Sequence, residues 1–476
     1  MQYKYRNLAK VCIDLRDHAA AKLFCFQRVK VNVFLSVLDS AKVFLALMCW
    51  ALSLPHILSL TDIEALADIA LIIFIGILLL SVMRLRLQSM IILLALLLIG
   101  WFILPELPSV YQLRNAGAFV LIFACLLPTL TLVRATAQTM PSVMETQRQL
   151  GQLPAKTSAS GLQLASHVLG GVMNIGAFAL VAATLPPKAG LERRRVAAEA
   201  SLRGMNGAVL WSPFFISFAV ANIYLPSGIS FGAIMLGLVT AGLFFLVTSA
   251  LAAPKGARFS VLDAMQPLRP ILPRLLIAVS AVILLSVATG FTALLAVVTT
   301  MPILCVIQMC RRPQTARQIA QTFWQLQKGS GDELVIISAS MVIASLAADT
   351  TSLSVMLNGL IGRDLSIWLM IWGLPVLVWL ASVLGVHPVI SAAPLLAYFA
   401  PSLTVFDAIF VMQAHMIGWA AGTMTSFSSL SVVLVGELFR LPTSVLCAGR
   451  NLWASGGLAF VGGGLWAAVW LLAGQL

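Results

Sequence analysis

The sequence predicts an all-α polytopic membrane protein with about eleven transmembrane helices and two re-entrant hairpins arranged as an inverted repeat. Of its 476 residues, 60% are hydrophobic and only 10% are charged, whereas soluble domains contain roughly 45–50% and about 25%. Apolar runs of about 20 residues recur along the chain, and each is long enough to cross a hydrocarbon core as a helix. Lys and Arg lie between these runs, so we interpret the net charge of +13 as topological anchoring rather than as a nucleic-acid interface.

The expected spans follow the apolar runs in chain order. A basic segment precedes the first of them, and acidic residues interrupt it before any apolar run begins, which is untypical of a cleavable signal. We interpret this segment, residues 1–42, as a cytoplasmic leader, followed by a first half over 43–309 and a second half over 310–476. The spans are expected at 43–60, 66–83, 87–104, 115–133, 204–224, 229–252, 274–290, 291–309, 333–350, 404–437 and 451–473.

Two apolar stretches, 161–187 and 365–401, are left between the spans. Lys156 precedes the first stretch and several basic residues follow it within 188–203, so the positive-inside rule predicts that both of its flanks are cytoplasmic. The stretch is too short for two crossings of about 20 residues each. We therefore predict that it enters and leaves the membrane by the same face, as a re-entrant hairpin.

The distribution of basic residues supports the same treatment of both stretches. If both are re-entrant, all of the 30 Lys and Arg except Arg114 and Arg363 lie on the cytoplasmic side. If each stretch crosses once, the two sides share them almost evenly, which the positive-inside rule disfavours. The preferred topology places the N-terminus in the cytoplasm and the C-terminus outside, in a bacterial-type inner membrane. The second hairpin then enters from outside, opposite to the first.

Polar residues and helix breakers at membrane depth mark the candidate site, because unpaired polar groups are costly in hydrocarbon. Each hairpin has such residues near its middle, and the helices that follow, 204–224 and 404–437, have them at mid-span. Half-helix ends at these breaks offer amides to an anion and carbonyls to a cation. The candidate substrate- and ion-binding residues are His167, Gly170, Gly171, Asn174, Asn206, Ser212, Pro213, His387, Pro388, Ser391, Thr423, Thr425, Ser426, Ser428 and Ser429.

Structural roles stay open for each of these residues taken alone. A hydroxyl within a span often bonds the carbonyl one turn back, Pro213 by itself would kink a helix, and a histidine in a membrane often only packs. The joint placement of four polar groups favours a functional site. The chain has no phosphate-binding loop, HExxH or GxSxG signature, so we expect no enzyme, no metal and no cofactor. Energy would come from a proton or sodium gradient.

In this order of spans and hairpins the chain resembles the ion transporter superfamily, most closely the divalent anion:sodium symporters, with arsenite and citrate permeases as relatives. The resemblance covers about residues 43–473 and rests on architecture. It implies a carboxylate substrate and sodium bound at hairpin tips and helix breaks, and an elevator movement against a homodimeric scaffold. The Ser-Asn-Thr signature of that family is absent, since Gly-Gly-Val-Met-Asn stands at 170–174 and His-Pro-Val-Ile-Ser at 387–391.

The sequence therefore predicts a secondary active transporter of a small anionic solute, embedded in membrane lipid, with no nucleic-acid partner. The histidines make the proton an alternative coupling ion to sodium, because imidazole titrates near neutral pH. Two other classes remain as alternatives. One is a membrane-embedded enzyme or assembly factor for lipid-linked or envelope substrates, with His167 and His387 as catalytic groups. The other is a structural membrane subunit that docks through the basic leader.

Overall fold

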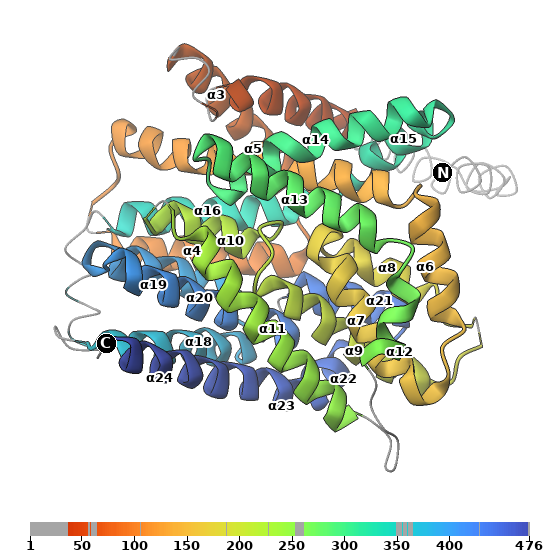
Figure 1. Cartoon of the computed structure of the whole chain (residues 1–476). Helices are drawn as coiled ribbons and strands as arrows, with labels where there is room; N and C mark the ends of the chain where they lie inside the picture. The colour runs from red at the N-terminus through yellow and green to blue at the C-terminus, as the bar shows by residue number, and fades with distance from the viewer. Residues whose placement is uncertain are drawn as a thin grey trace, which may run out of the picture.

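The computed structural model is helical throughout the residues that it describes (Figure 1), which are 37–55, 58, 64–104, 106–186, 188–226, 228–252, 261–348, 355, 359, 365–427 and 429–474. Within these residues, eight helices are long and apolar enough to cross a membrane. The number becomes nine if α15 (Pro313–Lys328) and α16 (Gly331–Ala348), which meet at a bend of 53°, form one span. The all-α, multi-pass class is confirmed. The number of eleven spans and the re-entrant course of the two hairpins stay predictions.

One layer of the fold, which we call the scaffold layer, lies along the upper side of Figure 1 and reaches into its middle. Within it α16 packs against α3, α4 and α5, while α14 packs against α5, α13 and α15. The apolar side chains of α13 face outward, as expected of a helix in contact with lipid. The layer consists of the helix Val37–Pro55, α3 (Glu64–Val82), α4 (Leu87–Ile103), α5 (Val110–Ala137), α13 (Leu272–Thr289), α14 (Ala293–Arg311), α15 and α16.

The other layer, which we call the core layer, contains the same order of elements twice. Each set has a helical hairpin, then a helix that is broken in the middle, then one more long helix. The first set is α7 (Ala155–Met173), α8 (Gly176–Ala182), α9 (Leu191–Val209), α10 (Ile216–Tyr224) and α11 (Ser230–Ala252). The second set is α18 (Ile367–Val383), α19 (Pro388–Phe399), α20 (Val405–Thr425), α21 (Leu430–Phe439), α23 (Arg450–Gly457), the π-helical turn η3 (Leu458–Gly462) and α24 (Gly463–Ala473).

A glycine brings each hairpin close to its broken helix. In the first set, a Cβ at Gly204 on α9 would collide with the backbone carbonyl oxygen of Gln163 on α7. In the second set, a Cβ at Gly422 on α20 would collide with the hydroxyl oxygen of Ser382 on α18. Small residues permit this approach of helix backbones, which is a common way of packing membrane helices. In both sets, therefore, a glycine on the broken helix allows the hairpin to pack closely against it.

The two sets also exchange contacts. The second limb of the first hairpin, α8, packs against α21 of the other set, and the second limb of the second hairpin, α19, packs against α10. The unbroken parts α9 and α20 pack directly on each other. Each hairpin therefore ends against the broken helix of the other set, and the four interruptions come together in the middle of the core layer.

Most expected spans lie within a few residues of a helix, but three boundaries differ. The first broken helix was expected at 204–224, whereas α9 already begins at Leu191, because the basic stretch that we interpreted as a loop is its first turns. Residues 1–36 of the expected leader lie outside the described residues, and its last residues belong to the helix that begins at Val37. The expected division at 309 falls near the end of α14.

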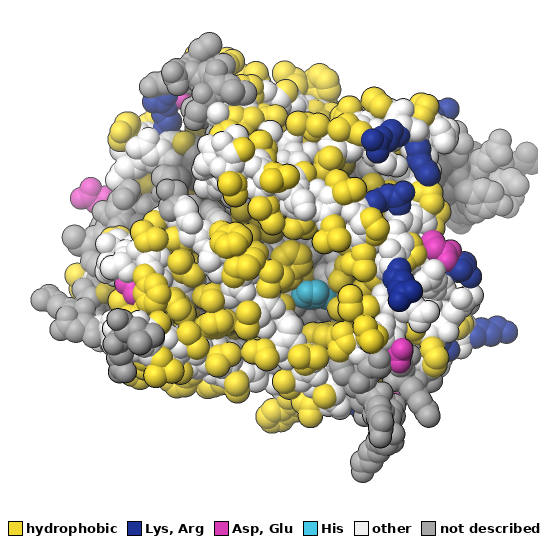
Figure 2. Space-filling view, in the orientation of Figure 1, with side chains coloured by type: hydrophobic (Ala, Val, Ile, Leu, Met, Phe, Trp, Pro, Cys, Tyr) yellow, Lys and Arg dark blue, Asp and Glu magenta, His cyan; other side chains and the backbone are white. Residues whose placement is uncertain are grey.

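Short polar helices connect the apolar ones, and we did not expect them from the sequence. Basic side chains gather at the end of the molecule where α6 and α15 lie (Figures 1 and 2). α15 is amphipathic and packs its apolar side against α5. This arrangement agrees with basic segments on one side of a membrane, although the orientation itself stays a prediction. The short elements are α6 (Pro141–Gly151), α12 (Val261–Met265), η1 (Gln266–Leu268), η2 (Ala400–Ser402) and α22 (Thr443–Cys447).

Candidate functional site

The tip of the first hairpin is formed by Asn174 and Ile175. Asn174 has a φ of 52°, in the left-handed region, which Asn tolerates because its short polar side chain bonds locally. Its Oδ1 accepts a hydrogen bond from the amide of Ile175 at 2.7 Å. The turn therefore lies at the end of the Gly170–Asn174 segment in which the sequence predicts it.

The first break is tied to this hairpin through Ser212. Its hydroxyl donates a hydrogen bond to the carbonyl oxygen of Gly171 and accepts one from the amide of Phe214 at 3.2 Å. Pro213 lacks an amide donor, so the helical bonding of α9 cannot continue through it. Ser212 is completely buried. It holds the break against the hairpin rather than facing open space.

The second hairpin turns at Gly385, whose φ of 93° suits glycine. His387 is the N-cap of α19, where its Nδ1 accepts from the amide of Val389 at 3.3 Å. Pro388 is the first helical residue, a position that needs no amide donor. The hydroxyl of Ser391 bonds back to the carbonyl oxygen of Pro388 at 3.2 Å. Pro388 and Ser391 therefore shape the start of α19.

The second break interrupts α20 after Thr425. The amide of Ser426 bonds the carbonyl oxygen of Gly422 at 2.9 Å, and the amide of Ser429 bonds that of Ser426 at 3.1 Å. The hydroxyl of Thr425 points away toward α23, where it accepts from Ser455 at 3.4 Å. α21 then begins at Leu430. Ser428 lies outside the described residues.

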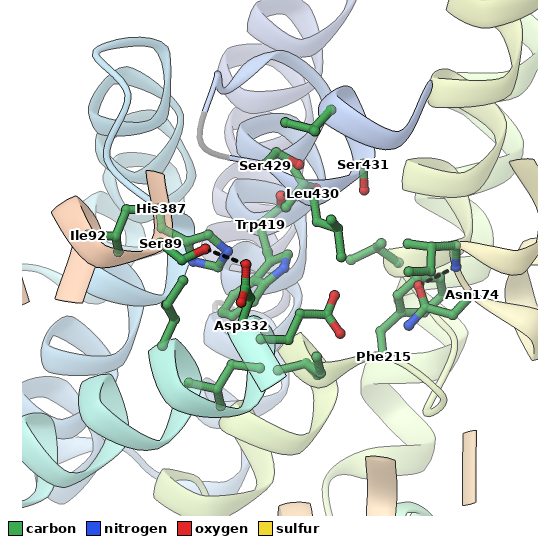
Figure 3. Close-up of a pocket in the computed structure, with 18 of the residues that line it drawn as sticks. Ser89, Ile92, Asn174, Phe215, Asp332, His387, Trp419, Ser429, Leu430 and Ser431 are labelled. Carbon is green, nitrogen blue, oxygen red and sulfur yellow. Dashed lines mark hydrogen bonds between the residues drawn. The ribbon is translucent and has the colours of Figure 1, made fainter. Parts of the chain in front are cut away.

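Both tips and both breaks line one cavity of about 130 Å³. Figure 3 shows it enclosed by the side chains of Asn174 and Phe215 on one side and by His387 and Ser89 on the other, with Ser429 between them. Its walls come from the core layer and from the scaffold helices α4 and α16. By a 1.4 Å probe, one water molecule needs roughly 10–15 Å³. The cavity can therefore hold several waters or a small solute.

The structure divides the candidate residues into two groups. Five of them line the cavity: Asn174, Asn206, His387, Thr423 and Ser429. Nine others do not line it and instead support the hairpins and breaks behind its wall: His167, Gly170, Gly171, Ser212, Pro213, Pro388, Ser391, Thr425 and Ser426.

The polar pair Asn206 and Thr423 joins the two broken helices at the cavity wall. The hydroxyl of Thr423 donates to Asn206 Oδ1, while Asn206 Nδ2 donates to the carbonyl oxygen of Leu202 at 2.8 Å. Asn206 is fully buried, and Thr423 is 9% exposed. Buried polar groups that satisfy each other in this way fix the relative position of their helices. The pair thus holds α9 and α20 together beside the space that a solute would occupy.

The two hairpin histidines have different surroundings. His387 lines the cavity and lies edge-on to the ring of Trp419, with 6.1 Å between the ring centroids. His167 lies on α7, well before the tip, and its Nε2 accepts from the indole of Trp211 at 3.2 Å. The structure therefore places only His387 where it can meet a solute.

Five polar residues of the scaffold layer also line the cavity, and sequence reasoning missed them. Asp332 accepts from the hydroxyl of Ser89 at 2.9 Å and lies 3.8 Å from the guanidinium of Arg86. Gln88 donates to the carbonyl oxygen of Phe427 in the second break at 2.6 Å. Arg86 had been interpreted as a loop anchor. The available signal was the adjacent acids at the start of an apolar span, Asp332 and Glu333.

The site has the chemistry of a binding pocket without a metal cage. Within the described part of the chain, no three His, Cys, Asp or Glu side chains gather in a way that could hold a metal ion. The donors are amides, hydroxyls, an imidazole and a guanidinium, and the acceptors are two carboxylates and carbonyl oxygens. Such a set can bind a small polar solute by hydrogen bonds.

Comparisons with known proteins add one likeness of architecture. No family model matches the sequence, and no curated protein matches it. Among solved structures, the chain is similar to the Alcanivorax borkumensis YdaH transporter, whose crystal structure is described as revealing an unusual topology. The two are 14% identical, with a TM-score of 0.45 over 83% of this chain and 98% of that one. Because the identity and the TM-score are both low, we take neither family nor function from this likeness.

Proposed function

We propose that the chain is a secondary active transporter of a small anionic solute, coupled to a proton or sodium gradient. One observation carries the proposal. Two hairpin tips and two helix breaks open on the same cavity, although the two tips, like the two breaks, lie more than 200 residues apart in the chain. Interrupted helices are costly in a membrane unless their freed backbone groups line protein or a polar space. Their convergence supports a site in which the freed groups bind a solute and a coupling ion.

An anion is supported by the direction of the half-helices. α10, α19 and α21 all begin beside the cavity, and helix N-termini carry partial positive charge and free amides. His387 adds an imidazole on the core side of the lining, and Arg86 adds a guanidinium on the scaffold side. A carboxylate or phosphate of a small solute therefore fits the core side of the cavity.

A coupling cation is supported by the scaffold side. The carboxylates of Asp332 and Glu333 both line the cavity, where Arg86 and Lys42 lie near Asp332 and Arg134 lies near Glu333. Carboxylate oxygens are ligands for a small cation, and they can also carry a proton. Helix N-termini on the core side and carboxylates on the scaffold side thus suit an anion and a coupling cation that travel together.

An elevator-type movement is supported by where the cavity lies. Its walls belong to both layers, and Gln88 of the scaffold layer bonds the second break of the core layer across it. If the core layer slid along α4 and α16, the tips and breaks would move together. The part of the scaffold layer that faces the cavity would then change. We further propose a homodimer in a bacterial-type inner membrane, with the scaffold layers in contact.

The proposal is tested by uptake into proteoliposomes that contain the purified full chain. Radiolabelled mono- and dicarboxylates and inorganic phosphate would be offered under an imposed proton gradient, an imposed sodium gradient or neither. Accumulation of one anion that collapses with an ionophore for the coupling ion is the expected result. Protein-free liposomes and the Thr423→Val variant serve as controls. Equal counts in protein-free and protein-containing liposomes under every gradient would refute transport of these anions.

A further inference from the structure

A second and larger cavity lies on the outer side of the core layer, between α11 and the last helix of the chain. It has a volume of about 560 Å³, and α23, η3 and α24 form the wall opposite α11. Most of its lining is aliphatic or aromatic. It shares no residue with the cavity between the two layers. Nothing in the proposed transport cycle uses it.

Two arginines stand at one end of this groove. Arg203 is only 5% exposed, and its guanidinium is held by the side-chain oxygens of Gln163 at 3.2 Å and Asn451 at 2.8 Å. These bonds use Nε and Nη1, and Nη2 has no hydrogen bond to any described residue. Arg450, the first residue of α23, lines the groove beside it. The buried carboxylate of Glu199 lies near this guanidinium, and Nη2 is the donor left over for a further anionic group.

The arginine end lies next to the charged first turns of α9. A Cβ at Gly449, which precedes Arg450, would lie 2.8 Å from Glu199 Oε1 and 3.5 Å from Arg195 Nη2. Glu199 is buried and paired with the partly exposed Arg195, and exposed charged residues such as Arg450 lie at the level of lipid headgroups when the neighbouring helices span a membrane. The groove therefore runs from a headgroup level into the apolar depth of the protein.

Several apolar side chains that line the rest of the groove are not covered by any other part of the described chain. Leu251, Trp453 and Val461 all line it, and they are 81%, 82% and 71% exposed. Apolar side chains that are this exposed face lipid acyl chains when the surrounding helices span a membrane. Tryptophan is enriched at the membrane interface, where its ring can cover the upper part of a lipid chain.

We propose that this groove binds an anionic phospholipid, with its phosphate on Arg203 and Arg450 and an acyl chain along α11 and η3. The two arginines favour an anionic group, and the apolar lining favours a hydrocarbon chain, so the ligand should contain both. A free phosphate would leave the apolar slot unfilled, and a neutral hydrocarbon would leave Arg203 Nη2 without an acceptor. Basic pockets between membrane helices on the headgroup side are known to hold anionic lipids. The proposal holds whatever solute the protein carries.

Two variants test the site without disturbing the packed core. In Arg450→Gln, an exposed charge is removed while the buried Arg203 network stays intact. In Gly457→Leu, the new side chain enters the groove, and no atom lies within 4 Å of the position that its Cβ takes. The matched control is Gly242→Leu on α11, which also has open space at Cβ but does not line the groove.

The measurement is native mass spectrometry of the full chain with phosphatidylglycerol or phosphatidylcholine added to the detergent. We expect retained phosphatidylglycerol on the wild type, about fivefold weaker retention in Arg450→Gln, and loss of retention in Gly457→Leu. Gly242→Leu should bind as the wild type does. Each sample is first checked for a single elution peak and an unchanged unfolding temperature.

Three results would overturn the proposal. The first is equal phosphatidylglycerol retention by all four proteins. The second is displacement of the lipid by millimolar inorganic phosphate, which would make the site a phosphate site. The third is loss of a dimer, with lipid retention unchanged, in Gly457→Leu but not in Gly242→Leu, which would assign the groove to a second copy of the chain.

Discussion

The hydroxyl of Thr423 on α20 donates a hydrogen bond to the side-chain oxygen of Asn206 on α9, and this bond joins the two broken helices beside the cavity. Thr423→Val should lower uptake about tenfold, because a buried acceptor left without a donor costs roughly 1–3 kcal/mol. Thr423→Ser keeps the donor and should retain most activity. Initial uptake rates per folded molecule in proteoliposomes make the comparison.

The matched control for this bond is Thr425→Val. The sequence predicts both threonines as binding residues, but in the structure the hydroxyl of Thr425 points toward Ser455 and away from the cavity. Its replacement should leave uptake within about twofold of the wild type, since the two hydrogen bonds that are lost are both long, at 3.3 Å to the carbonyl oxygen of Ala421 and 3.4 Å from Ser455. Equal losses in Thr423→Val and Thr425→Val would contradict the placement of the site.

Gly204→Ala should destabilise the protein, because its Cβ would collide with a backbone oxygen of α7 that cannot rotate away. Overpacking of this kind costs about 1–3 kcal/mol. Gly242→Ala has open space around its Cβ on α11 and should be neutral or slightly stabilising, since alanine is the better helix former by about 1 kcal/mol. Unfolding temperatures in detergent distinguish the two. An unchanged unfolding temperature for Gly204→Ala would mean that α7 and α9 can move apart without loss of stability.

Asp332→Asn should weaken the dependence of uptake on the coupling ion. The substitution keeps an acceptor for Ser89 but removes the carboxylate charge beside Arg86. We expect uptake to fall about tenfold at low concentrations of the coupling ion, since hydrogen bonds to charged groups contribute roughly 1.5–3 kcal/mol. High concentrations of the ion should restore part of it. Glu437→Gln, an exposed acid outside the cavity, is the control. The same ion dependence in both variants would remove Asp332 from the coupling site.

Cross-linking of Gln88→Cys to Phe427→Cys should stop transport, because these positions face each other across the two layers. The pair would be placed in a cysteine-free background and joined with a short bifunctional maleimide. We expect full loss of uptake on cross-linking and normal uptake in each single variant under the same treatment. Transport that continues in the cross-linked protein would rule out sliding of the core layer along the scaffold layer.

Labelling of cysteines placed at positions 158 and 190 should show both on the cytoplasmic side. These positions flank the first hairpin, and the basic residues beyond it favour the same side for each flank. Membrane-impermeant maleimide applied to whole cells should therefore miss both and label them after permeabilisation. Labelling of only one position in whole cells would make 161–187 a single crossing.

Much of the fold could be predicted from composition and chain order. Apolar runs indicated an all-α, multi-pass protein, and Gly385, Pro388 and Pro213 lie where the structure turns or interrupts its helices, because these residues limit backbone geometry locally. The start of α9 could not be predicted from charge alone. Its basic first turns are compatible with a loop or a helix, and packing against α7 decides between them.

The site could be predicted only in part. Asn174 and His387 were identified because they lie at the predicted hairpin turns, and the glycines and proline of such turns are visible in a sequence. Ser212 and Thr425 have the same local signals but turn their hydroxyls into the protein, which depends on long-range packing. Asp332 was missed because its adjacent acid pair marks only the start of a helix, whereas its place in the cavity depends on how α16 packs against the core layer.

The exchanged contacts of α8 with α21 and of α19 with α10 have a consequence for synthesis in the cell. When the ribosome has released the first hairpin and its broken helix, the partners of both are more than 150 residues further along the chain. The polar tip at Asn174 and the break at Ser212 must wait in the membrane, or in the insertion machinery, until α19 to α21 are made. The cavity is thus the last part of the molecule to mature, and truncations after α16 should expose the unfinished halves to quality-control proteases.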